Sequence, residues 1–462
     1  MPDIKSFNPG EILMIECENC GKENDKEANF CMNCGEELKT DRFDTGYSNA
    51  LQYSRADVVK DFNSQDIASE AEKNFEEGIK ALENNDDEEA IKKLNKATSI
   101  EPKYGEAWHV KGVIYGEQGQ EGLALTCFDK ATSINPDVAK AWCNKGLVNY
   151  LKEAYNQAIE CLDKAISINP EDPQSWAIKG LVYSEMEEYE EALKCHAQVL
   201  SINPENKEAW FNKGSVLVDM GRYDEAIESF DEALSLEPDD TEGWFNKGLA
   251  YFEKAEYREA IECFEKVVEF DPEDKDALYN KGLAHSELGD EEKAIQCYDR
   301  VIEMNPDEKD AWYNRAMSYF EMGNYYKAIK SFKKVVSIDP DDQEAWENKA
   351  LAWYNKGLVY AKEGKHKKAI KCFRKVTSID SDDIDAWIQK GLTYTKIGES
   401  NKALKCLKKA TSIEPENAKA WYYKGSIYKK RGEPIKAKDC FEKAENIDPS
   451  YKDVEKGISV VK

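Results

Sequence analysis

A period of 34 residues runs through most of this chain and constrains its fold more than any other feature. A sequence that repeats itself at such an interval is built from stacked copies of one supersecondary unit, so a single globular core is not expected. Tryptophan recurs at this step, interrupted once by Leu278 and once by a short irregularity, at Trp108, Trp142, Trp176, Trp210, Trp244, Trp312, Trp353, Trp387 and Trp421.

Three further columns share the period and indicate helix pairs. Glycine usually follows the tryptophan by four residues and an aromatic residue by seven, as in Trp108, Gly112 and Tyr115. These spacings place the three side chains on one face of a helix. Because glycine inside a helix costs about 1 kcal/mol relative to alanine, its recurrence predicts a close helix–helix approach, with the tryptophan packing over it. An alanine column marks a second helix, and a proline column ends each pair.

The full pattern, W-x3-G-x2-Y, then A-x3-F-x2-A, then P, resembles the tetratricopeptide repeat family. The resemblance implies an all-α fold, a superhelical solenoid of helix-turn-helix repeats whose first helices line a concave inner wall. It covers eleven units: repeats one to eight at residues 71–342 and repeats nine to eleven at 350–451. Residues 452–462 are expected to form a short C-terminal cap.

One irregularity interrupts the period at residues 343–349. Trp346 keeps the step from Trp312, yet the next unit is in register with Trp353. Seven extra residues amount to nearly two helical turns and rotate the helix face by only about 20°. We therefore expect the insertion to extend a first helix over about 343–362 rather than to break a repeat.

The N-terminal region carries a separate module. Cys17, Cys20, Cys31 and Cys34 have the spacing C-x2-C-x10-C-x2-C, which offers four thiolates to one tetrahedral Zn2+. The segment at 17–38 resembles a zinc ribbon, and a module of this size needs its metal to fold. One structural zinc is therefore predicted, against the alternatives of a redox dithiol or free thiols. Residues 1–16 form a tail, and the polar stretch 39–70 reads as a linker.

The family resemblance also suggests where partners bind. In these proteins the first-helix face usually holds a partner segment, and the positions after the tryptophan and four after the glycine point there. The central repeats place an apolar and aromatic strip at these positions, at Phe211, Val218, Phe245, Phe252, Tyr279, Tyr313 and Phe320. Acidic residues precede the strip at Glu208, Glu242, Asp276 and Asp310. A groove with an acidic rim predicts protein partners with basic and apolar segments; alternatively, some of these rings only fill space between the first helices.

No catalytic motif is found. The chain lacks G-x4-G-K-[ST] and G-x-G-x2-G, and none of its four histidines pairs with a nucleophile or second ligand at a recognisable spacing. Eight repeat cysteines occupy one column, from Cys127 to Cys440, and are expected to be small apolar core residues. No enzyme activity, small-molecule substrate or further cofactor is predicted.

The charge distribution keeps two alternatives open. The chain has a formal net charge of −27, but residues 350–462 are net positive. The zinc ribbon and the basic last repeats could bind nucleic acid, and oppositely charged ends could support self-assembly. No apolar run is long enough for a transmembrane helix, and no secretory signal is recognised, so no membrane association and a cytoplasmic location are expected.

Overall fold

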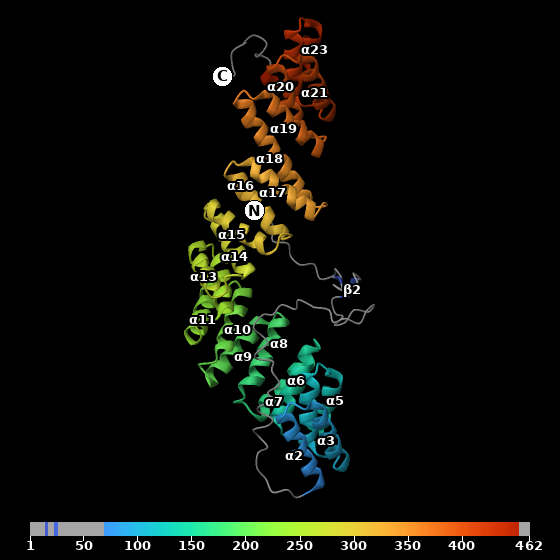
Figure 1. Cartoon of the computed structure of the whole chain (residues 1–462), viewed down its shortest axis with the longest axis vertical. Helices are drawn as coiled ribbons and strands as arrows, with labels where there is room; N and C mark the ends of the chain where they lie inside the picture. Colours follow the sequence, from blue (N-terminus) through green and yellow to red (C-terminus); the bar gives the residue numbers. More distant parts are fainter. Residues whose placement is uncertain (1–13, 17–22, 26–68, 452–462) are drawn as a thin grey trace. The chain divides into compact units, whose positions relative to one another are not determined.

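The computed structural model describes residues 14–16, 23–25 and 69–451 (Figure 1). The N-terminal tail, the four ribbon cysteines, the linker and the C-terminal cap lie outside these residues. Two strands, β1 (Met14–Glu16) and β2 (Glu23–Asp25), pair antiparallel with Ile15 opposite Asn24. Between residues 70 and 451 every regular element is helical, which confirms the predicted all-α fold of helix-turn-helix repeats.

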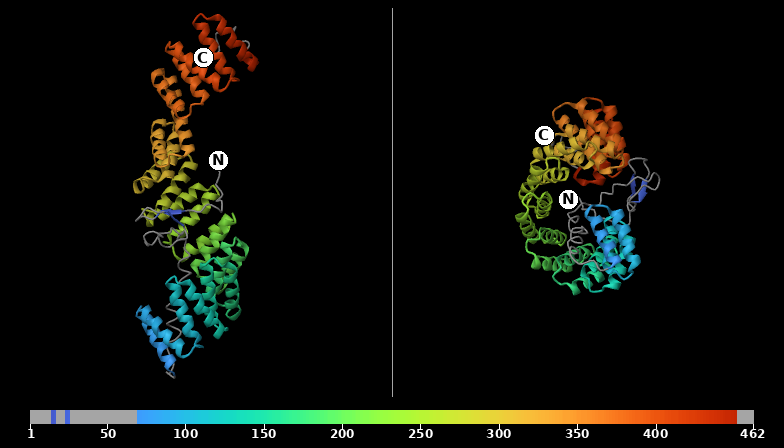
Figure 2. Two further views of the ribbon diagram at one scale, coloured as in Figure 1. Left: turned by 90° about the vertical axis from the view of Figure 1, so that its right-hand side faces the viewer. Right: turned by 60° about the horizontal axis from the view of Figure 1, so that its bottom comes forward.

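The helices belong to two compact units, which divide after Pro238. In each unit, helices follow one another as antiparallel pairs (Figures 1 and 2). The first unit has the first helices α2 (Glu70–Glu83), α4 (Gly105–Glu117), α6 (Ala139–Leu151), α8 (Pro173–Glu185) and α10 (Lys207–Asp219). Its second helices are α3 (Asp87–Ile100), α5 (Glu121–Ile134), α7 (Tyr155–Ile168), α9 (Tyr189–Ile202) and α11 (Tyr223–Leu236).

The second unit repeats this arrangement. Its first helices are α12 (Thr241–Glu253), α14 (Lys275–Glu287), α16 (Lys309–Glu321), α18 (Gln343–Lys362), α20 (Ile384–Lys396) and α22 (Ala418–Lys430). Its second helices are α13 (Tyr257–Phe270), α15 (Glu291–Met304), α17 (Tyr325–Ile338), α19 (His366–Ile379), α21 (Ser400–Ile413) and α23 (Pro434–Ile447). The insertion expected at 343–349 falls in the first turns of α18, which has 20 residues where the other first helices of this unit have 13.

Local sequence explains where the helices begin and end. Most first helices start at an Asp or Asn whose side chain accepts a backbone N–H of the first turn, as Asp342 does from Ala345. This contact satisfies a donor that has no partner within the helix. The turn to the second helix needs one residue with positive φ, usually glycine, such as Gly323 at 71°. Ala255 adopts the same conformation at 59° without glycine's freedom.

The glycine column is covered by the second helix, not by the tryptophan as the sequence predicted. A Cβ on Gly248 would lie 2.7 Å from Cε1 of Phe264, which is sixteen residues later on α13. The same relation joins Gly214 to Phe230 at 2.6 Å. The large side chain of the second helix therefore lies directly on the bare backbone of the first helix, which explains why the glycine is tolerated.

The tryptophans instead tie each first helix to the preceding loop. The indole N–H of Trp142 donates to the carbonyl of Pro136 at 2.8 Å, six residues earlier. Equivalent bonds are made by Trp108, Trp176, Trp210, Trp312, Trp346, Trp387 and Trp421. Thus tryptophan and proline act together at the junction between repeats.

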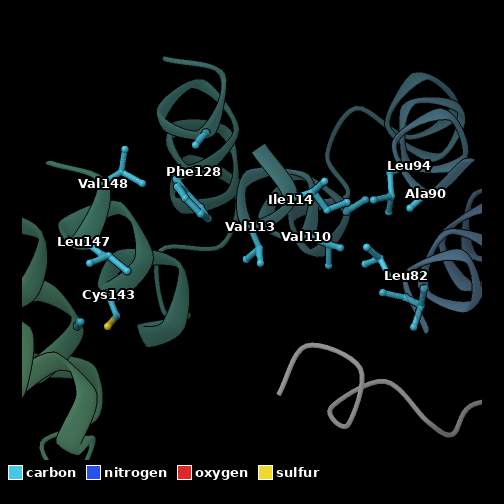
Figure 3. Close-up of a cluster of buried hydrophobic side chains, with 14 of the residues drawn as sticks. Leu82, Ala90, Leu94, Val110, Val113, Ile114, Phe128, Cys143, Leu147 and Val148 are labelled. Atoms are coloured by element: carbon cyan, nitrogen blue, oxygen red, sulfur yellow. The ribbon is translucent and has the colours of Figure 1, made fainter. Parts of the chain in front are cut away.

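In the first unit, one cluster of buried side chains extends over the helices from α2 to α8, whereas the buried side chains of the second unit form several clusters. In the first unit, Figure 3 shows side chains from successive pairs, including Leu94, Ile114 and Leu147, directed into the space between the helices. The nine repeat cysteines are buried and form no disulfide within the described residues, as expected of small core residues. Burial raises the pKa of the Cys127 thiol to about 11, so it stays protonated at neutral pH.

Candidate functional site

The aromatic residues after the tryptophans are anchored on the second helices of their own repeats. In the second unit, the rings of Phe245 and Phe264 have centroids 5.7 Å apart, and those of Tyr279 and Tyr298 are 6.0 Å apart. Tyr313 contacts the ring of another second helix, that of Phe332, at 5.8 Å. These side chains are half-buried, so each contributes both to the core and to the accessible face of the first helices.

Asparagines two residues after the tryptophan position connect successive repeats, a contact that the sequence analysis missed. Asn314 on α16 donates to the hydroxyl of Tyr279 on α14 at 2.7 Å, and Asn348 on α18 donates to Tyr313 at 2.9 Å. Tyr313 in turn donates to Glu344 Oε1 at 2.6 Å. The signal was present in the sequence, because Asn recurs at this position in most central repeats.

Two carboxylates lie next to these tyrosines. Asp276 and Asp310 stand three residues before Tyr279 and Tyr313, a spacing that places each pair on one helix face. Both carboxylates are exposed, and neither makes an ion pair with a described residue. Burial, reinforced by Asp310, raises the pKa of Tyr279 to about 12, so its hydroxyl remains neutral. The face therefore combines neutral hydroxyls with uncompensated negative charge.

The residues four positions after the glycine add apolar surface to the predicted strip. Phe252, seven residues after Phe245, contacts Tyr257 edge-on at 5.2 Å. Phe320 contacts Tyr325 in the same way at 5.3 Å. Both phenylalanines are half-buried near the turn to the second helix. The structure thus places Phe245, Phe252, Tyr279, Tyr313 and Phe320 on the first helices α12, α14 and α16 of one unit, with Glu242 on α12.

The remaining predicted residues belong to the first unit. Phe211 on α10 is only 8% exposed and contacts Phe230 at 5.7 Å, so it is mainly a core residue. Val218 and Glu208 are half-buried on the same helix. The expected strip is therefore divided between units, and the part in the second unit is more accessible.

The predicted metal ligands lie outside the described residues. Cys17 and Cys20 fall in the sequence between β1 and β2, whereas Cys31 and Cys34 follow β2. Four cysteines in two C-x2-C pairs supply the donor set of a tetrahedral zinc site. In the described part of the chain, no other group of His, Cys, Asp and Glu forms a metal site.

Family comparisons agree with these observations. Models described as tetratricopeptide repeat match residues 105–138, 212–275, 276–308, 310–342, 350–383 and 418–451, and a TPR repeat model matches 391–432. A zinc-ribbon domain model matches residues 17–38. The chain is a tetratricopeptide repeat protein with an N-terminal zinc ribbon. Residues 151–233 of these repeats also match a model described as anaphase-promoting complex, cyclosome, subunit 3.

Solved structures of repeat proteins resemble parts of the chain. YrrB, described as a TPR protein with an unusual peptide-binding site, is 26% identical over 41% of this chain and 97% of its own, with a TM-score of 0.37. MamA is 25% identical over 36% of this chain and 96% of its own, with a TM-score of 0.34. Part of a repeat protein from Cytophaga hutchinsonii is 18% identical over 53% and 97%, with a TM-score of 0.45. The comparison with curated proteins gave no match.

The tetratricopeptide repeats indicate a protein-interaction scaffold in general terms. Proteins of this family and fold are typically non-catalytic. Among the described helices, none is both long and apolar enough to cross a bilayer.

Proposed function

We propose that this protein is an adaptor that holds partner segments on the first-helix face of its second unit. The partner segment carries apolar anchors and Lys or Arg side chains. The observation that carries the proposal is the pairing of the exposed, uncompensated carboxylates of Asp276 and Asp310 with the half-buried rings of Tyr279 and Tyr313.

The chemistry of this face favours a basic partner over an acidic one. A lysine or arginine of a bound segment would reach Asp276 or Asp310 without breaking an existing ion pair. An exposed pair of this kind contributes little affinity by itself, about 0–1 kcal/mol, so its main effect is on orientation and partner choice. Most of the affinity would come from apolar anchors beside Phe252 and Phe320, because burial of such groups dominates at interaction hot spots.

The proposal assigns no reaction to the chain and one structural zinc to Cys17, Cys20, Cys31 and Cys34. The donor set supports this assignment, since four cysteines close a tetrahedral site and leave no position for substrate. The ribbon would then be a second binding module beside the repeats. A cytoplasmic location belongs to the same proposal.

An array of immobilised peptides tests the partner chemistry. Each apolar-anchored sequence is presented in three forms, with Lys, Gln or Glu at the charged positions. The Lys forms are expected to bind best, and stronger binding of the Glu forms would contradict the acidic-rim interpretation. Asp276→Asn together with Asp310→Asn should weaken binding of the Lys forms by about threefold to tenfold, with little effect on the Gln forms.

A matched variant controls for net charge. Glu262 on α13 and Glu303 on α15 are exposed carboxylates on second helices of the same unit. Glu262→Gln with Glu303→Gln removes the same two charges away from the tyrosines and should leave affinity nearly unchanged. An equal loss in both double variants would mean that only overall charge attracts the peptides. Salt-sensitive binding of RNA or DNA in place of peptides would favour the nucleic-acid alternative.

A further inference from the structure

The insertion in α18 is accompanied by a pocket that the regular repeats do not explain. The pocket encloses about 700 Å³ between α17, α18 and α19. Its polar lining consists of Lys333, Lys349 and Lys375, the indoles of Trp346 and Trp353, and Ser378. No carboxylate belongs to this lining. The volume lies within the range of about 300–1,000 Å³ that is usual for small-molecule sites.

Lys349 lacks the acidic partner that its equivalents have in several other repeats, as do Lys390 and Lys424 in the last two repeats. In several repeats the cation three residues after the tryptophan position pairs with an acid sixteen residues earlier, on the preceding second helix. Examples are Lys179 with Asp163 at 2.6 Å and Arg315 with Asp299 at 2.6 Å. The corresponding residue for Lys349 is Lys333. An attractive pair between neighbouring repeats is thus replaced by a repulsive one.

Lys375 has lost its partner for a different reason. Two equivalent lysines pair with an acid in the loop 27 residues earlier, Lys334 with Asp307 at 2.9 Å and Lys409 with Asp382 at 3.5 Å. For Lys375 the equivalent acid is Asp341, but the insertion lies between them. Within residues 69–451, Lys375 makes no ion pair.

Trp353 adds an unused neutral donor to the same pocket. Eight other tryptophans donate the indole N–H to the carbonyl six residues earlier. Six residues before Trp353 is Glu347, which lies inside α18 rather than in a loop. Among the described residues, no acceptor is found for this N–H. Three lysines and an indole donor therefore line one cavity, and none of its described lining residues is a carboxylate.

We propose that this pocket binds a compact, multiply charged phosphate-bearing small molecule. Clustered phosphate oxygens would accept from all three lysines at once and relieve their mutual repulsion. The low exposure of Lys349, with Lys333 and Lys375 nearby, already disfavours its charged form and lowers its pKa. This ligand is separate from the peptide proposed for the first-helix face.

The surroundings favour a compact ligand over an acidic polymer. A neighbouring cavity shares Trp346 and Ile379 with this one, and it is lined by Glu347, Asp380, Asp383 and Asp385. An anionic chain that extended past these shared residues would meet four carboxylates. A small phosphate compound can occupy the basic cavity without entering the acidic one.

Titration calorimetry of the full chain with inorganic pyrophosphate, in about 150 mM salt, tests the proposal. We expect saturable binding of one pyrophosphate per chain. Lys333→Asp creates the acid–cation pair that several other repeats have and should weaken binding about tenfold or more, without loss of helical structure. Trp353→Phe removes one neutral donor and should weaken binding severalfold.

Lys371→Asp provides the matched control. Lys371 is an exposed lysine of α19 that does not line the pocket, and the substitution makes the same change in net charge. An unchanged affinity in this variant supports the site. Equal weakening in both Asp variants, no saturable binding, or tighter binding of an acidic octapeptide than of pyrophosphate would each overturn the proposal.

Discussion

Asn314 on α16 donates to the phenolic hydroxyl of Tyr279 on α14, with 2.7 Å between nitrogen and oxygen. Asn348 and Tyr313 form the same bond one repeat later, at 2.9 Å. These contacts join the first helices of consecutive repeats through side chains that also form the proposed binding face. Stability between repeats and the chemistry of the face are therefore linked at the same residues.

Replacing Asn314 with alanine should loosen the contact between α14 and α16. The hydroxyl of Tyr279 would lose its donor, and a hydrogen bond of this kind contributes about 0.5–1.5 kcal/mol. Hydrogen exchange should rise locally in these two helices, because a repeat array responds to a change mainly through its neighbours. Tyr279→Phe in the same background should add little further loss. Additive losses in the double variant would mean that the two groups are not coupled.

Alanine at Gly248 should destabilise the repeat formed by α12 and α13. The new Cβ would lie 2.7 Å from Phe264, and overpacking of this kind costs about 1–3 kcal/mol. The better helix propensity of alanine returns about 1 kcal/mol, so the net loss should be at most about 2 kcal/mol. Chemical denaturation followed by circular dichroism measures the change.

A second substitution shows whether the clash is the cause. Phe264→Leu should recover part of the loss, since in another repeat a Cβ on Gly391 would lie 3.1 Å from Leu407, farther than the 2.7 Å between Gly248 and Phe264. The loss of stability cannot be large in every repeat, because one repeat already has alanine at the glycine position. There Ala316 is fully buried and lies in the same core cluster as Phe332. If Gly248→Ala alone is neutral, the repeats adjust their spacing more easily than the packing indicates.

The pattern of columns predicted the fold because each column has a local physical cause. The glycine and alanine positions indicate where two helices pack closely, and the proline positions indicate where helices end. Both features depend on residues that are close in the sequence. The partner of the glycine could not be assigned in the same way. Trp244 is close to Gly248 in the sequence and on the same helix, whereas Phe264 is on the second helix of the repeat. Only the packed helix pair shows that Phe264 is the side chain that covers Gly248. The unpaired lysines of the α18 pocket were missed for a similar reason, because a missing ion pair is visible only by comparison with pairs formed elsewhere.

His196 should make the first unit sensitive to mild acid. Its ring is fully buried over Gly180, neither ring nitrogen has a hydrogen-bond partner among the described residues, and burial lowers its pKa from 6.5 to about 4. Because the unfolded chain binds the proton more readily, stability is unaffected above pH 6.5 and falls as the pH drops from about 6.5 towards 4. Each pH unit in this window can cost up to about 1.4 kcal/mol.

Substitution tests the assignment of this pH dependence. His196→Phe introduces the side chain that Phe230 provides at the equivalent position of the next repeat. Between pH 6.5 and 4 the variant should lose less stability than the parent, with the difference concentrated in hydrogen exchange of α8 and α9. Identical pH profiles would show that other groups, such as the many carboxylates, account for the acid sensitivity.

Removal of zinc should affect the N-terminal module and leave the repeats folded. Elemental analysis should find one zinc per chain, and Cys17→Ser or a strong chelator should release it. All described helices lie between residues 70 and 447, and their cores contain no ribbon residue. Helical circular dichroism and the thermal transition of the repeats should therefore be unchanged. A large loss of helix on chelation would show that the ribbon supports the stack.

Deletion of residues 343–349 should convert α18 into a first helix of ordinary length. Asp342 would then precede Ala350, and Trp353 would stand where Trp346 stands now, six residues from the carbonyl of Pro340. The indole N–H of Trp353 would gain the acceptor that it lacks, and Asp342 could still cap the helix. We expect the thermal transition to be maintained or raised, while pyrophosphate binding is lost because the pocket closes. Retained binding would place the phosphate site elsewhere, and a loss of helical structure would show that the long helix is needed for the stack.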